Sequence, residues 1–216
     1  MEKEYLFIVF FGGLVLIFIA LFWFRVIRKD KITPKSHGAP EIYETLPNYF
    51  EGSVSCSSIS SWLKGPLATF KGKFEGYEFS LDFRIVTYFV GRFYLTLYSD
   101  YKSKLNIYIY TGNRGPVLFA KKINTGFQNF DKEFVIYSNN PNKAKQIFYD
   151  DTNRNSLIKI RRQGWNPPHI AKNKITAERA FSFKKWEIID HMLIEETLKD
   201  MIVLSENIKK QVVHTH

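Results

Sequence analysis

The chain has 216 residues, of which 45% are hydrophobic and 17% aromatic, and its formal net charge is +10. This length suits one ordinary domain with a packed core plus an additional segment, and it excludes two large domains. Cys56 is the only cysteine, which excludes an internal disulfide and fits a reducing compartment.

An apolar run near the N-terminus predicts a membrane span. Residues 5–24 read YLFIVFFGGLVLIFIALFWF and contain no charged side chain. A helix of about twenty residues extends about 30 Å, the thickness of the hydrocarbon core of a bilayer. A cleaved signal peptide is the alternative, but the preceding residues are not basic overall and no small-residue cleavage site follows the run. We therefore predict a transmembrane helix over residues 5–27.

The flanks of this run predict its orientation. Residues 1–4 contain one Lys and two Glu, whereas five cations follow the run: Arg25, Arg28, Lys29, Lys31 and Lys35. Flanks rich in Lys and Arg stay on the cytoplasmic side of a membrane. We therefore predict a single-pass protein of the cell (inner) membrane, with a short tail of residues 1–4 outside and the C-terminal part in the cytoplasm.

Residues 28–66 have the composition of a basic juxtamembrane segment and a linker. They contain several turn-forming residues and a small, polar run, SVSCSSISS, at 53–61. Such sequences are typical of tethers with irregular local structure. Three aromatic residues of the segment could still pack on a domain: Tyr43, Tyr49 and Phe50. We place a folded cytoplasmic domain at residues 67–216.

Alternation of apolar and polar residues predicts antiparallel strands in this domain. Residues 67–74 and 77–85 flank the turn-forming pair Glu75-Gly76, which predicts a hairpin. Further strands are predicted at 117–123, at 132–138 and, as one or two strands, at 173–183.

The clearest alternation lies in residues 92–99 and 104–111. Apolar residues share one face of these two predicted strands: Phe93, Leu95, Leu97, Leu105, Ile107 and Ile109. The opposite face carries four tyrosines: Tyr94, Tyr98, Tyr108 and Tyr110. This tyrosine face is either a protein-docking surface, since Tyr supplies contact area at low entropy cost, or a surface covered by the last helix. We favour the covered arrangement, because a single-layer sheet needs something to pack on.

Three helices are predicted in the second half of the chain. Asn140-Pro141 combines an N-cap with Pro at the first helical position. A short helix at 155–163 ends at Gly164, and a long amphipathic helix runs from about 187 to 212. The apolar stripe of the long helix consists of Ile194, Leu198, Met201, Leu204, Ile208 and Val212. The predicted fold class is α+β: an N-terminal transmembrane helix, then an antiparallel-sheet domain with a long C-terminal amphipathic helix.

The cationic excess is concentrated in residues 143–185, with eleven Lys and Arg against three Asp and Glu. The run RRQGWNPPHIAKNK at 161–174 could bind nucleic acid, contact anionic lipid, or reverse the chain direction. We do not predict nucleic acid as the partner, because no recognition motif accompanies the charge. We favour chain reversal, with Trp165 as a core or edge anchor, and a secondary partner or lipid contact through Arg161, Arg162, Trp165, Lys172 and Lys174.

One segment resembles a known pattern. The run TGFQNFDKEFVIYSNNPNKAKQIF at 125–148 resembles a signature of uncharacterised, membrane-anchored bacterial domains, through Thr125, Gly126, Phe130, Asp131, Phe134 and Val135. The resemblance implies a Phe-Asp-x-x-Phe strand followed by a short helix, and it implies no activity. Physically, Asp131 suits a role in hydrogen bonding turn amides.

No sequence motif supplies catalytic chemistry. The chain contains no nucleophile elbow, phosphate-binding glycine loop, dinucleotide fingerprint or zinc-binding helix pair. We predict no catalytic, cofactor-binding or metal-binding residues, and no cofactor. The predicted function is a single-pass membrane-anchored interaction or accessory module, such as a small subunit of a larger membrane protein complex. The alternatives are a peripheral domain that binds anionic lipid and an enzyme acting on a membrane-associated substrate.

Overall fold

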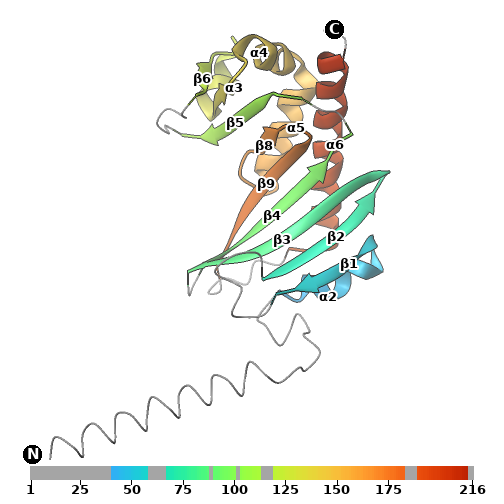
Figure 1. Cartoon of the computed structure of the whole chain (residues 1–216). Coiled ribbons are helices and arrows are strands. Elements are labelled where there is room, and N and C mark those ends of the chain that lie inside the picture. The colour runs from blue at the N-terminus through green and yellow to red at the C-terminus, as the bar shows by residue number, and fades with distance from the viewer. Residues whose placement is uncertain are drawn as a thin grey trace, which may run out of the picture. The chain divides into compact units, whose positions relative to one another are not determined.

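The computed structural model describes residues 40–57, 67–87, 90–100, 103–112, 119–182 and 189–213. These residues build a nine-stranded sheet of order β1-β2-β3-β4-β9-β8-β5-β7-β6, in which every pairing is antiparallel (Figure 1). The predicted α+β class, with an antiparallel sheet and a C-terminal helix, is therefore confirmed.

The domain begins earlier than the sequence indicates. Helix α2 (Ile42–Thr45), the 3-10 helix η2 (Leu46–Asn48) and strand β1 (Glu51–Cys56) precede residue 67. Tyr43 has 0% exposed surface, and its hydroxyl donates a hydrogen bond of 3.0 Å to the Leu81 carbonyl. Because these residues pack on the sheet and add a strand to it, residues 40–57 belong to the domain rather than to a linker.

The predicted hairpin is confirmed. Strands β2 (Ala68–Phe74) and β3 (Tyr77–Thr87) flank a two-residue turn in which Glu75 and Gly76 have φ of 49° and 82°. Positive φ at both turn residues matches the right-handed twist of the strands. Strand β4 (Val90–Tyr98) pairs with β3 and continues the sheet.

The middle of the chain forms the other end of the sheet. It contains β5 (Asn106–Thr111), β6 (Lys121–Ile123), helix α3 (Gln128–Glu133) and β7 (Phe134–Ser138). The strand predicted at 132–138 therefore begins two residues later, because α3 occupies the residues before Phe134 and buries Phe130. Strand β6 covers only the end of the segment predicted at 117–123, of which residues 117 and 118 lie outside the described residues.

Two capped helices follow. In α4 (Pro141–Tyr149) the Asn140 side chain accepts a hydrogen bond of 3.2 Å from the Lys143 amide, which confirms the predicted cap. Helix α5 (Asp151–Arg162) starts earlier than predicted, because Asp150 caps it by accepting from the Thr152 amide at 2.8 Å. The helix ends before Gly164, whose φ is 87°.

The stretch 161–174 reverses the chain direction, as predicted. After α5 the chain forms a short strand that the sequence did not indicate, β8 (His169–Ala171), then a turn at Lys172 and Asn173, then β9 (Lys174–Ser182). Strands β8 and β9 lie between β5 and β4, so they connect the two ends of the sheet.

The last helix, α6 (His191–Val213), covers one face of the sheet. It begins later than predicted because the Asp190 side chain accepts a hydrogen bond from the Leu193 amide at 2.8 Å. The apolar stripe from Ile194 to Ile208 is fully buried, while the side chain of Val212 lies outside the described residues. In Figure 1, α6 runs behind β3 and β4.

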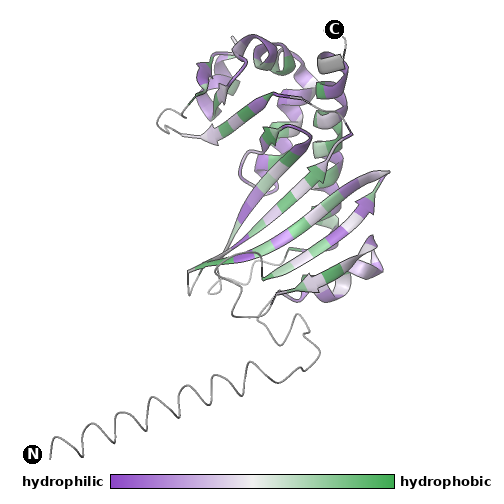
Figure 2. Ribbon diagram, viewed as in Figure 1, coloured by the Kyte–Doolittle hydropathy of each residue, from purple (hydrophilic) through white to green (hydrophobic). Residues whose placement is uncertain are grey.

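The described helices all pack on this same face. The core cluster joins the apolar residues of β2, β3 and β4 to those of α2, α4, α5 and α6. Figure 2 shows the corresponding alternation of hydrophobic and hydrophilic residues along the strands. Within the described residues, the sheet therefore has one face that helices cover and one face that no helix covers, and we call the second one the open face.

The predicted transmembrane helix at 5–27 and its basic flank lie outside the described residues. Among the residues that the structure describes, no helix has the length and apolar character that crossing a membrane requires.

Candidate functional site

The open face carries the tyrosines that the sequence singled out. Strand register places Tyr98 between Glu78 of β3 and Lys174 of β9, and Tyr94 between Asp82 and Glu178. Since side chains alternate across a strand, these residues point away from the helices. Tyr98 is 39% exposed, and the other three tyrosines are partly exposed: Tyr94, Tyr108 and Tyr110.

The expectation that the last helix covers this face is wrong. Helix α6 lies on the other face, where the Ser99 and Ser205 hydroxyls are hydrogen bonded and Tyr77 contacts Glu206. The sequence could not decide between the two faces of β4, because both carry large side chains. Helix α6 packs on the apolar face, because Phe93, Leu95 and Leu97 bury more apolar area than the tyrosine face would.

Neighbouring side chains hold the tyrosines of β4 in place. The Arg84 guanidinium lies 5.2 Å from the centre of the Tyr94 ring, a cation–π contact. The Tyr98 hydroxyl lies 3.3 Å from the Ser80 hydroxyl. Orienting contacts of this kind lower the entropy that a side chain loses when a partner binds.

A second aromatic group lies where β8 joins β5. The Tyr108 and His169 rings are stacked, with centroids 4.4 Å apart and an interplanar angle of 16°. Burial, and secondarily the charge of Lys174, lowers the pKa of His169, so the imidazole is neutral at physiological pH. Its Nε2 atom is buried and has no hydrogen-bond partner in the described part of the chain. Tyr108 and His169 therefore form a flat, uncharged platform on the open face.

Two of the predicted contact lysines lie beside these aromatic residues. Lys174 is the cross-strand neighbour of Tyr98, and Lys172 is in the adjacent turn. The Lys172 amide donates a hydrogen bond of 3.3 Å to the Leu105 carbonyl, which brings Lys104 next to the same turn. All three lysines are exposed. Lys104 was not among the predicted contacts, because it is distant in the chain from the basic window.

The other predicted contacts lie elsewhere. Trp165 has 0% exposed surface, so it does not face a partner or lipid, and its interpretation as a core anchor is confirmed. Arg161 and Arg162 form the last turn of α5, in the helix layer. The described residues of the basic window are thus divided between the two sides of the sheet.

A shallow groove of about 520 Å³ lies at the β1 end of the open face. Its charged and polar walls are Glu51, Lys71, Lys73, Glu78 and Tyr98. The floor includes the backbone of two paired glycines, Gly52 and Gly72, and a Cβ at either one would come within 2.6 Å of the Phe70 ring. The groove therefore offers both ammonium and carboxylate groups beside Tyr98.

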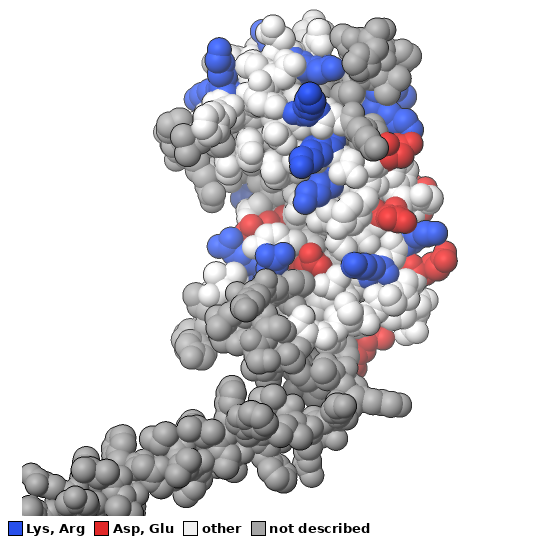
Figure 3. Space-filling model, viewed as in Figure 1, with Lys and Arg blue, Asp and Glu red and all other residues white. Residues whose placement is uncertain are grey.

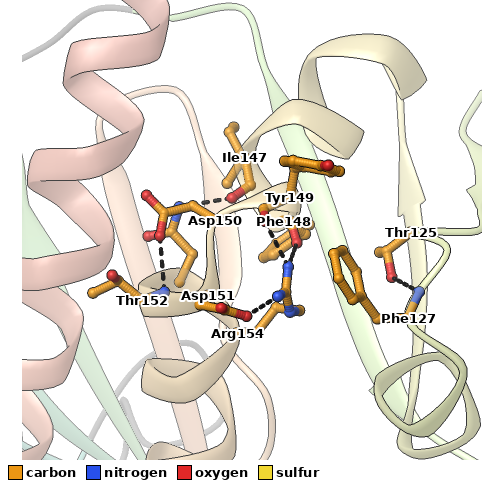
Figure 4. A network of polar contacts seen from close by, with 10 residues as sticks. Thr125, Phe127, Ile147, Phe148, Tyr149, Asp150, Asp151, Thr152 and Arg154 are labelled. Atoms are coloured by element: carbon orange, nitrogen blue, oxygen red, sulfur yellow. Dashed lines mark hydrogen bonds and ion pairs between the residues drawn. The ribbon is translucent and has the colours of Figure 1, made fainter.

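The polar network at the other end of the sheet is structural (Figure 4). Asp131 accepts hydrogen bonds from the Thr125 and Gly126 amides, each at 3.1 Å, which confirms the predicted role in the turn. Arg154 lies over the Phe127 ring at 3.4 Å, donates to the Tyr149 carbonyl at 2.7 Å and pairs with Asp151. These contacts fix the corner between α4 and α5.

Neither a metal-binding group among the described residues nor a related protein points to another site. The described residues contain no group of three or more His, Cys, Asp and Glu side chains that could hold a metal ion. No protein-family model, curated protein or solved structure matches this chain. The resemblance of residues 125–148 to membrane-anchored bacterial domains therefore stays a prediction.

Proposed function

We propose that this chain is a single-pass, membrane-anchored interaction module, an accessory subunit whose protein partner docks on the open face of the sheet. The observation that carries the proposal is the one-sided sheet: the described helices cover one face, and the other presents oriented, partly exposed tyrosines. Tyrosines with a fixed orientation supply contact area at a low entropy cost, and they are enriched at protein interfaces.

The membrane anchor is the second part of the proposal. Its support is the uncharged run at 5–24 together with the cations that follow it, from Arg25 to Lys35. The lipid bilayer and one or more membrane proteins are then the partners. In this arrangement the anchor keeps the domain at the cytoplasmic surface, where the open face meets a neighbouring subunit.

Site-specific photocrosslinking tests the docking surface. The full-length chain in its native membrane carries p-benzoylphenylalanine in place of Tyr98. We expect a discrete crosslinked adduct, recovered in stoichiometric amount after gentle detergent extraction, because an interface that uses Tyr98 places the partner within reach of the probe.

A matched position provides the control. Tyr149 of α4 is 71% exposed and lies in the helix layer. The same substitution there is expected to give no adduct with that partner. Equal adducts at both positions, or a chain that is extracted alone and crosslinks to nothing at Tyr98, would overturn the proposal.

A further inference from the structure

We infer that the partner docks through an acidic segment of its own chain, bound by a cluster of three lysines on the open face: Lys104, Lys172 and Lys174. This inference rests on the proposed function and names the chemistry of the partner. We call these residues the lysine cluster.

Three separate chain segments meet at the lysine cluster. The Lys172 amide is hydrogen bonded to the Leu105 carbonyl, and the Ser99 amide donates to the Asn173 carbonyl at 2.7 Å. These bonds join the β8–β9 turn to the segments that end β4 and begin β5. On the face seen in Figure 3, Lys and Arg gather over the part of the molecule that contains β5 and β8, whereas Asp and Glu lie mostly lower and along α6.

The described residues leave the charge of the lysine cluster without a paired carboxylate. In the described part of the chain, none of the three ammonium groups forms an ion pair. Asp100 follows the end of β4 and Glu178 is four residues from Lys174 along β9, and both are paired with other cations: Asp100 with Lys209 at 2.7 Å and Glu178 with Arg92 at 2.9 Å. The field of Lys174 also contributes to the lowered pKa of His169. The cluster is therefore a local centre of positive potential.

The fold does not require a lysine at the tip of the turn. Lys172 has a φ of 53°, in the left-handed region that favours glycine or asparagine. Its side chain is exposed. Strained residues of this kind concentrate at binding sites. Glycine or asparagine would suit this turn, so the lysine adds an exposed charge that the turn itself does not need.

The surroundings favour a short acidic protein segment over a long polyanion. Tyr98 and the stacked pair Tyr108 and His169 flank the cluster and supply apolar contact area. Beyond Tyr98, however, the face carries Glu78, with Asp82 further along the same strand. A nucleic acid strand crossing the sheet would meet these carboxylates, whereas a short segment with a few acidic side chains fits within the lysine cluster.

A lipid surface fits less well for the same reason. An anionic membrane that contacts the open face would also meet Glu78 and Asp82, which it repels. A short protein segment can end before it reaches these carboxylates.

Binding of a defined acidic peptide tests the inference. The full-length chain in nonionic detergent is titrated with a fluorescein-labelled ten-residue glutamate peptide, at low salt and at physiological salt. We expect binding that weakens with salt. The triple variant K104Q/K172Q/K174Q is expected to bind about tenfold more weakly, because three exposed ion pairs together account for roughly that factor.

A charge-matched variant separates the site from the net charge. Lys132, Lys145 and Arg162 are exposed residues of the helix layer, and K132Q/K145Q/R162Q removes the same three charges. We expect this variant to bind the peptide as the wild type does. Thermal unfolding of each variant checks that the domain remains folded.

The Tyr98 crosslinking experiment is then repeated in both backgrounds, and the crosslinked partner peptide is sequenced by mass spectrometry.

The outcomes distinguish the two proposals. Loss of the adduct only in the lysine-cluster variant, with an acidic partner peptide, supports the inference. An adduct that persists in that variant, or equal loss of glutamate-peptide binding in both variants, overturns the inference and leaves the proposed function in place. Tighter binding to a thymidine oligonucleotide, or to vesicles containing phosphatidylserine, also overturns it. Absence of any adduct at Tyr98 overturns the proposed function itself.

Discussion

Lys172 has a backbone conformation that does not favour lysine, so its proposed role in binding comes at the expense of stability. A left-handed conformation costs an L-residue about 1–2 kcal/mol, and glycine adopts it freely. Glycine also has more conformational entropy in the unfolded chain, which offsets about 0.5–1 kcal/mol of that gain. We therefore predict that Lys172→Gly raises the free energy of unfolding by about 0.5–1 kcal/mol, as measured by urea denaturation.

A second turn provides the comparison. Glu75 has a φ of 49° in the β2–β3 turn, and Glu75→Gly is expected to stabilise the domain similarly. If both variants are more stable but only Lys172→Gly weakens binding of the glutamate peptide, the role of Lys172 is functional. A destabilised Lys172→Gly variant would contradict this account of the turn.

The buried carboxyl of Asp200 in α6 should make the stability of the domain depend on pH. Burial raises the pKa of this carboxyl above its ordinary value of 3.8. The hydrogen bond from Gln163 at 3.2 Å and the ion pair with Lys159 at 3.8 Å act in the opposite direction but do not cancel the effect of burial. A carboxyl with a raised folded-state pKa favours folding when it is protonated. The corresponding stability is lost as the pH rises from the unfolded-state pKa through the folded-state pKa.

We therefore predict that Asp200→Asn is more stable than the wild type at pH 7, and that the difference shrinks as the pH falls toward 3.8. Asparagine retains an acceptor for Gln163 and never ionises. Urea unfolding of both proteins across this pH range measures the difference. A wild type that becomes relatively more stable as the pH rises would show that the ion pair with Lys159 outweighs burial.

At the scale of elements, Arg154 holds the α4–α5 corner. Its side chain is 8% exposed, donates to the Phe148 and Tyr149 carbonyls at the end of α4, and lies over Phe127. Arg154→Met removes the guanidinium donor from both carbonyls, and the contact with the Phe148 carbonyl is buried. We predict a loss of about 2–3 kcal/mol in the free energy of unfolding, the typical cost of removing charged hydrogen bonds.

Arg162 of the same helix is the control for this prediction. It is exposed at the end of α5, so Arg162→Met is expected to change the unfolding free energy by less than about 0.5 kcal/mol. Similar losses for both variants would mean that the general charge of α5, rather than the contacts of Arg154, stabilises the corner.

The elements that the sequence predicted are those with a strong local signal. Strands β2 to β5 alternate over many residues, and Asn140-Pro141 marks the start of α4. Strand β1 was missed because EGSVSC has no alternation of large side chains, and it is a strand only through its pairing with β2. Strand β8 has three residues and depends in the same way on β5 and β9.

The candidate site was predictable only in part, for the same physical reason. Alternation alone assigns Tyr94, Tyr98, Tyr108 and Tyr110 to one face. Which face the helices cover depends on tertiary packing, and it was predicted incorrectly. The lysine cluster depends on a backbone hydrogen bond between Lys172 and Leu105, which no local pattern in the sequence indicates.

At the scale of the whole molecule, the balance of acidic and basic residues differs between the two ends of the sheet. Residues 40–57, at the β1 end, contain three Glu and no Lys or Arg, whereas residues 119–164 contain nine Lys and Arg against four Asp and Glu. Acidic residues are repelled by an anionic membrane surface, so the proposed attachment to the membrane rests on the apolar N-terminal run and not on residues 40–57.

This dependence leads to a prediction about the anchor. Residues 34–216 form one compact unit, so removing residues 1–33 is expected to leave a domain that unfolds cooperatively. The full chain, reconstituted in phosphatidylcholine vesicles, is expected to stay with the vesicles after alkaline carbonate washing, because the apolar run favours insertion by several kcal/mol. The shortened chain is expected to stay in the supernatant. A full chain that carbonate removes would show peripheral binding, and the run at 5–24 would then need another role, such as packing against a partner.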